Sequence, residues 1–291
     1  MHSQKATINI FYLPALFLFC VFVIYPLISG IQISFTNWDG FHSMAAAKNV
    51  GFKNYARLLT DPNFSVAVKN TLIYGFGSTI FQNIIGMAFA IFLNSKFKGR
   101  SVVRTIIYLP VMVAPLIMGY MMYFLLQYSG GSLNDIMMLF HLEPVDWLSH
   151  SGTAVGIMTA INTLQFSGVS MVIYMAGLQN IPDMYYESAS IDGVGKWGQF
   201  RFITLPLLMP AITSSIMINI IGGLKLFDII RALISGSPTG AQSLSSYTPY
   251  IYFNQQNAGY AAVVGLASFA LIIIVSTVLV WFLDKWEVQM I

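Results

Sequence analysis

Long apolar runs and short polar segments alternate along the whole chain. Each run reaches or exceeds the roughly 20 residues that a helix needs to cross the hydrocarbon of a bilayer. The segments between the runs are short, so little of the chain is left for a soluble domain. We predict an all-α integral membrane protein with six transmembrane helices. The six runs cover residues 8–35, 66–94, 101–128, 152–178, 205–231 and 259–283.

The first apolar run could instead be a cleaved signal peptide. The apolar region of such a peptide is usually only about 7–15 residues long and is followed by a cleavage site of small residues. This run is longer, contains Pro14 and Pro26, and has no clean site. We interpret it as an uncleaved first span, with the signal peptide as the alternative.

A polar segment follows the first run and contains one short amphipathic stretch. Tyr55, Leu58 and Leu59 have the spacing of one helical face, and Asp61-Pro62 ends the stretch. We predict a short helix lying in the membrane interface. With the first span it forms the expected first region, residues 1–65, which precedes a five-helix core at 66–284 and a short tail at 285–291.

Composition supports the membrane assignment and excludes other classes. Hydrophobic residues make up 56% of the chain and charged residues 9%, whereas soluble domains carry about 25% charge. The net charge of +3 is too small to indicate binding to nucleic acid. The single cysteine, Cys20, excludes an intramolecular disulfide.

Basic residues indicate which side of the membrane each loop faces. Lys96, Lys98, Arg100 and Arg104 cluster between the second and third runs, which marks the cytoplasmic side. The segments 129–151 and 235–258 carry no lysine or arginine, as expected of outer loops. Six spans then place both termini in the cytoplasm. The first outer loop is an exception, because four basic residues lie in or around it. They could belong to the interfacial helix, and they are Lys48, Lys53, Arg57 and Lys69.

The densest cluster of charge lies at 177–206, between the fourth and fifth runs. One charged residue at the bilayer centre costs roughly 2.5–3.5 kcal/mol, so a segment with five of them stays in water. Pro182 suits the start of a helix, and Gly193 can adopt the left-handed conformation that ends one. A second short helix follows over 196–202. We predict a helix–turn–helix held against the membrane face.

The spacing within this segment resembles the EAA loop of permease subunits of binding-protein-dependent ABC importers. Glu187-Ser188-Ala189 is followed by Gly193 and, after nine intervening residues, by Ile203-Thr204-Leu205-Pro206. The departure is Ser188, where the family usually has alanine. The alternative is an ordinary polar loop. The resemblance implies that the loop docks in a cleft of a separate ATPase subunit through Pro182, Tyr186, Glu187, Ala189, Asp192, Gly193, Leu205 and Pro206.

Further short sequence motifs resemble those of the carbohydrate branch of these permeases, relatives of the maltose and glycerol-phosphate importers. They are Asn70-Thr71, Arg104 with Tyr108-Leu109-Pro110, Trp147-Leu148, Gly177-Leu178-Gln179-x-Ile181-Pro182, Leu226-Phe227-Asp228 and Gly259-Tyr260-Ala261-Ala262. Membership implies a bacterial cell membrane, a second permease as heterodimer partner, two ATPases that carry the ATP and Mg²⁺, and an extracytoplasmic solute-binding protein. This chain would bind no cofactor itself.

Residues that could perform catalysis are missing. The chain has no Gly-x4-Gly-Lys-Ser/Thr phosphate loop, no paired-carboxylate or Ser/His/Asp arrangement within the spans, and no Cys/His cluster with zinc spacing. We predict a transport subunit and not an enzyme, with any ATP hydrolysis on another chain.

Polar and aromatic residues inside the spans are candidates for a substrate path. Amides can bond sugar hydroxyls, and aromatic rings can stack on sugars. The alternatives are amides that bond helix to helix and aromatics that pack in the core. Asn162 and Gln165, three residues apart, make the best pair. The candidates are Asn83, Asn162, Gln165, Phe166, Asn219 and Phe227.

Three charged residues recur at intervals of three near the end of the fifth run. Lys225, Asp228 and Arg231 would share one helical face and could pair. They are candidates for an outer gate or a contact for a docking protein. The alternative is a self-neutralised patch at the interface.

We hypothesise that the chain forms half of the path of an ATP-driven importer of a sugar or oligosaccharide, working by alternating access. The alternatives are an ABC permease for a polyol phosphate, amino acid or peptide, a secondary transporter, and a membrane scaffold. Secondary transport would require acidic or histidine residues in the middle of the spans, and the sequence has none there.

Overall fold

We describe a computed structural model of the chain over residues 12–95, 97–234 and 240–290, with side chains to residue 285. Lys96, one of the basic residues that indicate the cytoplasmic side, lies outside the described residues. The chain divides into two compact units. One is built on Met1–Phe64 and Tyr247–Phe269, and the other on Ser65–Ser246 and Ala270–Ile291.

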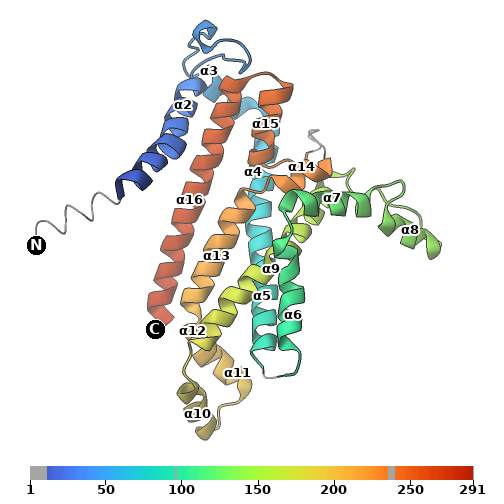
Figure 1. The fold of residues 1–291 in the computed structure, drawn as a ribbon, viewed down its shortest axis with the longest axis vertical. Coiled ribbons are helices and arrows are strands. Elements are labelled where there is room, and N and C mark those ends of the chain that lie inside the picture. The colour runs from blue at the N-terminus through green and yellow to red at the C-terminus, as the bar shows by residue number, and fades with distance from the viewer. Residues whose placement is uncertain (1–11, 96, 235–239, 291) are drawn as a thin grey trace, which may run out of the picture. The chain divides into compact units, whose positions relative to one another are not determined.

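Helices account for the apolar runs (Figure 1). Four helical segments of the described chain are long and apolar enough to cross a membrane: Tyr12–Ser34, Pro62–Asn94, Ser151–Gln179 and Ala258–Lys285. Two bent pairs of helices pass the same test when each pair is taken as one span, which brings the count to the predicted six.

The elements of the first unit start with a span that contains a π-helical turn, and the long helix α16 runs on into the second unit. They are η1 (Cys20–Ile24), α2 (Tyr25–Ser34), η2 (Met44–Ala46), α3 (Lys53–Thr60), α15 (Leu244–Asn254) and α16 (Ala258–Met290). The predicted short helix after the first span is therefore confirmed as α3. It ends at Asp61, whose extended backbone leads into Pro62.

The second unit holds the central spans and the charged segment. Its elements are α4 (Pro62–Leu72), η3 (Ile73–Gly77), α5 (Ser78–Asn94), α6 (Arg100–Tyr108), η4 (Leu109–Met112), α7 (Pro115–Leu126), α8 (Ser132–Leu139), α9 (Ser151–Gln179), α10 (Asp183–Ile191), α11 (Lys196–Gln199), η5 (Phe200–Thr204), α12 (Leu205–Leu207), α13 (Met209–Leu224) and α14 (Asp228–Ile234).

The third span is broken, which corrects the expectation of one continuous helix over 101–128. Its two halves meet at 94°, and α7 runs across the direction of α6 (Figure 1). Val113 and Ala114, with ψ angles of 131° and 134°, separate them. Proline disfavours the helical conformation in the residue before it and supplies no N–H, so Pro115 stops the helix from continuing through Ala114.

The fifth span is also bent, by 66° at Leu208. A helical rod over Lys196–Leu207 enters it, and α13 then runs to Leu224. The chain leaves the helix at Lys225 and begins a new helix at Asp228. The prediction that Lys225, Asp228 and Arg231 share one helical face is therefore wrong for Lys225, while Asp228 and Arg231 lie three residues apart in α14.

Two buried apolar clusters hold the second unit together. One joins α9 to α7 and α14 and includes Met158, Ile229 and Ile230. The other joins the end of α9 to α5 and to the start of the fifth span, and includes Tyr174 and Leu208. The second cluster lies next to the charged segment, so it connects that segment to the spans.

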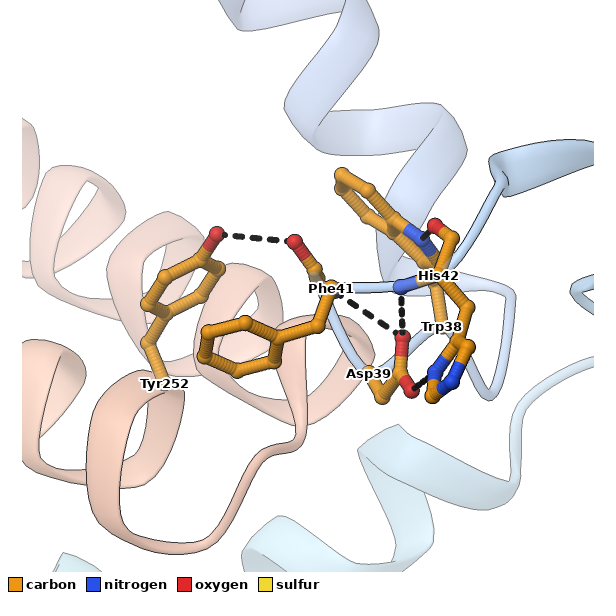
Figure 2. A network of polar contacts seen from close by, with 6 residues as sticks. Trp38, Asp39, Phe41, His42 and Tyr252 are labelled. Carbon is orange, nitrogen blue, oxygen red and sulfur yellow. Dashed lines mark hydrogen bonds and ion pairs between the residues drawn. The ribbon is translucent and has the colours of Figure 1, made fainter.

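Hydrogen bonds fix the loop of the first unit that follows the first span (Figure 2). Asp39 accepts bonds from the backbone N–H groups of Phe41 and His42, both at 3.0 Å, and its carboxylate pairs with the His42 ring. The Trp38 indole donates to the His42 carbonyl at 2.8 Å. The Tyr252 hydroxyl donates to the Gly40 carbonyl at 3.2 Å, which ties the loop to α15.

Candidate functional site

The charged segment folds as two short helices joined by a tight turn, as predicted. Pro182 caps the start of α10 in an extended conformation, and Asp183 lies in its first turn, where a negative charge favours the helix dipole. We call Pro182–Leu208 the coupling loop, after the role that the resemblance predicts for it. It lies at the end of the unit where α9 finishes and α12 begins (Figure 1).

Gly193 ends α10 in the left-handed conformation, with φ of +77°. The N–H of Gly193 bonds the Ser190 carbonyl at 3.2 Å, and the N–H of Val194 bonds the Ala189 carbonyl at 2.8 Å. These two bonds form the Schellman motif that satisfies the last carbonyls of a helix. No atom lies within 4 Å of where a Cβ would stand on Gly193. The backbone angle, and not lack of space, therefore requires glycine.

Side-chain bonds hold α10 against the helical rod that enters the fifth span. The hydroxyls of Tyr186 and Thr204 lie 2.9 Å apart. The Gln199 amide donates to the Ser190 hydroxyl at 3.0 Å and to the Val194 carbonyl at 3.2 Å. A force applied to α10 therefore reaches the rod through fixed contacts.

The coupling loop packs against the second apolar cluster, next to the end of α9. Tyr186 lies against that cluster, which includes Ile181 and Leu208. A Cβ on Gly177, near the end of α9, would lie 2.6 Å from Leu208 Cδ1 and 2.7 Å from Ala211 Cβ. This close approach brings the end of α9 into contact with the fifth span, next to the coupling loop.

The outer surface of the coupling loop is exposed and carries large apolar groups. Met184, Trp197 and Phe202 are exposed, and Ile191 is 86% exposed. The carboxylates of Glu187 and Asp192 bond no other described residue, and neither caps its own helix. The loop thus presents exposed apolar and acidic groups, while its own fold is held by other residues.

A pocket of about 270 Å³ lies between α5, α9, α13 and the break before α14. Its lining residues are Gln82, Pro115, Asn162, Phe166, Val169, Ile218, Asn219, Gly222, Gly223, Lys225, Leu226, Phe227 and Asp228. Four of the six predicted path residues therefore meet in one cavity: Asn162, Phe166, Asn219 and Phe227. We call this cavity the span pocket.

The other two predicted path residues bond elsewhere. Asn83 accepts a bond from the Tyr174 hydroxyl and donates to the Thr79 carbonyl at 2.7 Å. Gln165 donates to the Val113 carbonyl at 2.8 Å, at the break in the third span. Neither lines the span pocket. Each instead bonds another part of the protein, in line with the alternative that such amides hold the helices together. Asn162 and Gln165, predicted as the best pair on the path, therefore separate, because Asn162 lines the pocket and Gln165 does not.

Lys225 and Asp228 line the same pocket, so two of the three predicted gate residues lie beside the predicted path residues. The break before α14 places them there, and the buried Ser243 hydroxyl donates to the Leu226 carbonyl at 2.6 Å. Among the described residues the one side-chain ion pair is His42–Asp39. Lys225, Asp228 and Arg231 therefore do not neutralise one another.

Gln82, a further amide residue within the apolar spans, also lines the pocket. It is 1% exposed, and its amide nitrogen donates to the Asn162 carbonyl at 2.9 Å. Its Oε1 is buried and has no partner among the described residues. A buried acceptor without a partner costs free energy, so a ligand hydroxyl in the pocket would supply the missing donor. In the sequence, the signal for this role is an amide side chain within an apolar span.

Asn70 and Thr71, the pair near the start of the second span that resembles these permeases, also have a structural role. The Asn70 amide donates to the carbonyls of Gly240 and Gln242, at 2.7 and 3.0 Å. The Thr71 hydroxyl accepts the N–H of Leu244 at 2.9 Å. Asn70 and Thr71 therefore fix the chain that follows the fifth span.

Broken apolar helices around a partly polar pocket, with an exposed helical loop at one end, define a membrane transport subunit. The chain belongs to the family of binding-protein-dependent transport system inner membrane components, whose family model matches residues 82–288.

Relatives of known name cover almost the whole chain. The trehalose/maltose transport system permease protein MalF of Thermococcus litoralis is 31% identical over 90% of this chain and 88% of its own length. The arabinooligosaccharides transport system permease protein AraP of Bacillus subtilis is 31% identical over 95% of this chain and 88% of its own. The multiple sugar-binding transport system permease protein MsmF of Streptococcus mutans is 31% identical over 96% and 95%.

Solved structures share the fold. A chain of a bacterial ABC transporter involved in the import of the acidic polysaccharide alginate superposes with a TM-score of 0.80 at 24% identity. The match covers 99% of this chain and 96% of that one. A chain of an amino acid ABC transporter superposes with a TM-score of 0.56 at 16% identity. The fold is thus that of ABC importer permeases.

Proposed function

We propose that this chain is the permease subunit of an ATP-driven importer of a sugar or oligosaccharide. In this proposal it pairs with a second permease, two ATPase subunits and an extracytoplasmic solute-binding protein. ATP and Mg²⁺ bind to the ATPases. The relatives named for maltose, arabinooligosaccharides and multiple sugars support a carbohydrate as substrate.

The observation that carries the proposal is the content of the span pocket. Asn162, Asn219 and Gln82 bring amides into it, and Phe166 and Phe227 bring aromatic rings. Amides both donate and accept hydrogen bonds, as sugar hydroxyls do. Aromatic faces cover the apolar faces of sugar rings. The combination suits a neutral polyhydroxylated solute better than an apolar one.

Coupling to ATP hydrolysis is assigned to the coupling loop. Its exposed apolar side chains and unpaired carboxylates would bind in a cleft of the ATPase. Because Tyr186 and Gln199 tie α10 to the rod of the fifth span, closure of the ATPases would rotate that span. The span pocket lies on the same span, so its access would change with nucleotide state. This is a free-energy linkage between two distinct sites.

Transport by the complete assembly tests the proposal. The four kinds of subunit are reconstituted in proteoliposomes, and uptake of labelled maltose-type and arabinose-type oligosaccharides is measured with and without ATP inside. Expected is uptake that requires both ATP and the binding protein and that unlabelled sugars inhibit. Uptake of amino acids or peptides instead, or sugar uptake that persists without ATP, would refute the proposal.

Lys225 supports a second candidate, a phosphorylated or carboxylated solute. Lys225 lines the pocket and has no ion-pair partner among the described residues, although Asp228 also lines the pocket and offsets its charge. Changing Lys225 to glutamine distinguishes the two. An anionic substrate would lose uptake by an order of magnitude or more, since about 1.4 kcal/mol corresponds to tenfold, while a neutral sugar would be taken up nearly as before.

A further inference from the structure

We propose that α3 and the residues just before it form a binding site for anionic phospholipid at the membrane surface. Lys48 and Lys53 bind the headgroup, and Phe52 and Leu59 lie in the acyl boundary. The inference concerns the first unit alone and does not depend on the proposed transport function.

Hydrogen bonds place α3 at the depth where the first span ends. Ser34 is the last residue of that span. The Asn54 amide donates to the carbonyls of Ser34 and Thr36, both at 2.8 Å. The hydroxyls of Tyr55 and Ser34 lie 2.8 Å apart. A helix bonded to the end of a span at three points lies at the level of the lipid headgroups.

Aromatic rings gather at the same level. The ring centroids of Phe35 and Phe52 are 5.4 Å apart, and those of Phe35 and Tyr55 are 5.3 Å apart. Tyrosine and tryptophan are enriched where spans meet the headgroups. Trp38, three residues beyond Phe35, adds a fourth aromatic to this part of the first unit. The cluster therefore agrees with an interfacial depth.

The face of α3 that points away from Asn54 is apolar and open. Phe52 is 73% exposed and Leu59 is 85% exposed. Seven residues correspond to about two turns, so these two side chains lie on one side of the helix. Exposed large apolar groups beside lysines are the signature of a helix that lies in the membrane surface.

Charge in the first unit is unbalanced in a way that favours an anionic ligand. Its two carboxylates are already occupied: Asp39 pairs with His42, and Asp61 accepts bonds from Tyr247 and Tyr260 at 2.7 and 2.6 Å. Arg57 is held over the Tyr260 ring and bonds Gln255 at 3.0 Å.

The two lysines of this region are free of such partners. Lys48 and Lys53 are exposed, and their ammonium groups bond no other described residue. Both flank the exposed Phe52 in sequence. Lysines and arginines on an outer loop run against the usual distribution across membranes, and headgroup binding gives these two a role. The chemistry that fits is a lipid phosphate that carries a net negative charge.

Photolabelling of the full transporter tests the site. The assembly is placed in phosphatidylcholine nanodiscs with a trace of acyl-diazirine phosphatidylglycerol or of acyl-diazirine phosphatidylcholine. Labelling of the peptide over residues 48–60 is measured by mass spectrometry. We expect the phosphatidylglycerol probe to label this peptide about 25-fold more, because each of the two lysines near an anionic surface contributes about fivefold.

Matched variants separate the site from general charge effects. Lys48→Gln with Lys53→Gln should bring the ratio of the two probes to about one, and Lys48→Arg with Lys53→Arg should keep it. Phe52→Ser with Leu59→Ser should reduce labelling by both probes. Lys98→Gln, which removes one charge from an exposed position in a different loop, should leave the ratio unchanged.

Three results would overturn the proposal. The first is an equal yield of both probes on the unchanged protein. The second is an unchanged ratio in the double glutamine variant. The third is loss of labelling when the solute-binding protein is added, which would assign the face to that protein instead.

Discussion

The hydroxyl of Tyr186 lies 2.9 Å from that of Thr204 and joins α10 to the helical rod that enters the fifth span. Thr204 is buried within a π-helical turn, and Tyr186 packs on the apolar cluster under α9. Together with the Gln199–Ser190 bond, this contact makes the two helices of the coupling loop one body.

Changing Tyr186 to phenylalanine should weaken coupling and leave the ring packing intact. The lost bond is worth about 0.5–1.5 kcal/mol. We expect fewer solute molecules transported per ATP hydrolysed, measured as the ratio of uptake to ATPase rate in proteoliposomes. The control is Tyr185→Phe, since Tyr185 is exposed. An equal ratio in the two variants would count against a role for the Tyr186 hydroxyl.

Gly193→Ala should impair transport although nothing occupies the space around it. An L-residue in the left-handed region costs about 1–2 kcal/mol, and φ at Gly193 is +77°. Gly195 is the matched control, because its φ is −67° and its surroundings are equally open. Gly195→Ala should transport normally, and Gly193→Asn should recover part of the loss, since asparagine tolerates this conformation. Equal loss from both alanine variants would exclude the backbone explanation.

Asn162→Ala and Asn83→Ala should fail in different ways. Asn162 lines the span pocket, so its loss should raise the KM for uptake with little change in thermal stability. Asn83 bonds Tyr174 and Thr79, so its loss should cost about 0.6–1.7 kcal/mol of stability. Uptake kinetics and detergent thermal-shift curves measure both. A raised KM for Asn83→Ala together with a loss of stability for Asn162→Ala would show that the pocket is not on the path.

Gln165→Leu should destabilise the break in the third span. The Gln165 amide satisfies the Val113 carbonyl, which the broken helix leaves free. An unsatisfied buried carbonyl costs about 1–3 kcal/mol. We expect a lower melting temperature of the purified protein, with Gln32→Leu on the exposed side of α2 as the control. An unchanged melting temperature would mean that another group takes over the bond.

The pKa of His42 should be raised above its ordinary value of 6.5, because it bonds the Asp39 carboxylate. The hydrogen bond from His42 lowers the pKa of Asp39 from 3.8 to about 2. The contribution of His42 to loop stability is therefore complete below pH 6.5 and is lost as the pH rises through its raised pKa. The contribution of Asp39 is present above pH 3.8 and is lost as the pH falls toward 2.

Titration of ring-labelled histidines by NMR measures this shift, with His42→Gln to assign the signal. Asp39→Asn should lower the pKa of His42 toward 6.5. Since the chain has three other histidines, they serve as internal references. A His42 pKa that Asp39→Asn leaves in place would show that the pair does not form in solution.

Features set by nearby residues were predictable from the sequence. The coupling loop, its left-handed Gly193 and the short helix after the first span follow from charge, proline, glycine and apolar spacing within a few residues. The break in the third span had a signal that the sequence prediction did not use, since Pro110 and Pro115 lie five residues apart within one apolar run.

Features set by contacts between distant segments were not predictable in this way. Asn83 and Gln165 look like Asn162 and Asn219 in sequence, and only the neighbouring helices decide which of these residues line the pocket. Asn219 does so while its amide also donates to the Ser170 hydroxyl at 2.6 Å. The spacing of Lys225, Asp228 and Arg231 implied one helical face. The chain instead leaves the helix at Lys225, and Ser243, 17 residues away from Leu226, stabilises that departure.

Crosslinking of the coupling loop in the assembled transporter tests the central claim most directly. Cys20 is changed to serine, Ile191 at the exposed end of α10 is changed to cysteine, and a short bifunctional reagent is applied with and without ATP. His42→Cys, on the loop after the first span, is the control. We predict a crosslink from position 191 to the ATPase subunit, with a yield that changes with ATP, and none from position 42. A crosslink from position 42 alone, or no ATPase adduct at position 191 in a transport-competent assembly, would contradict the account.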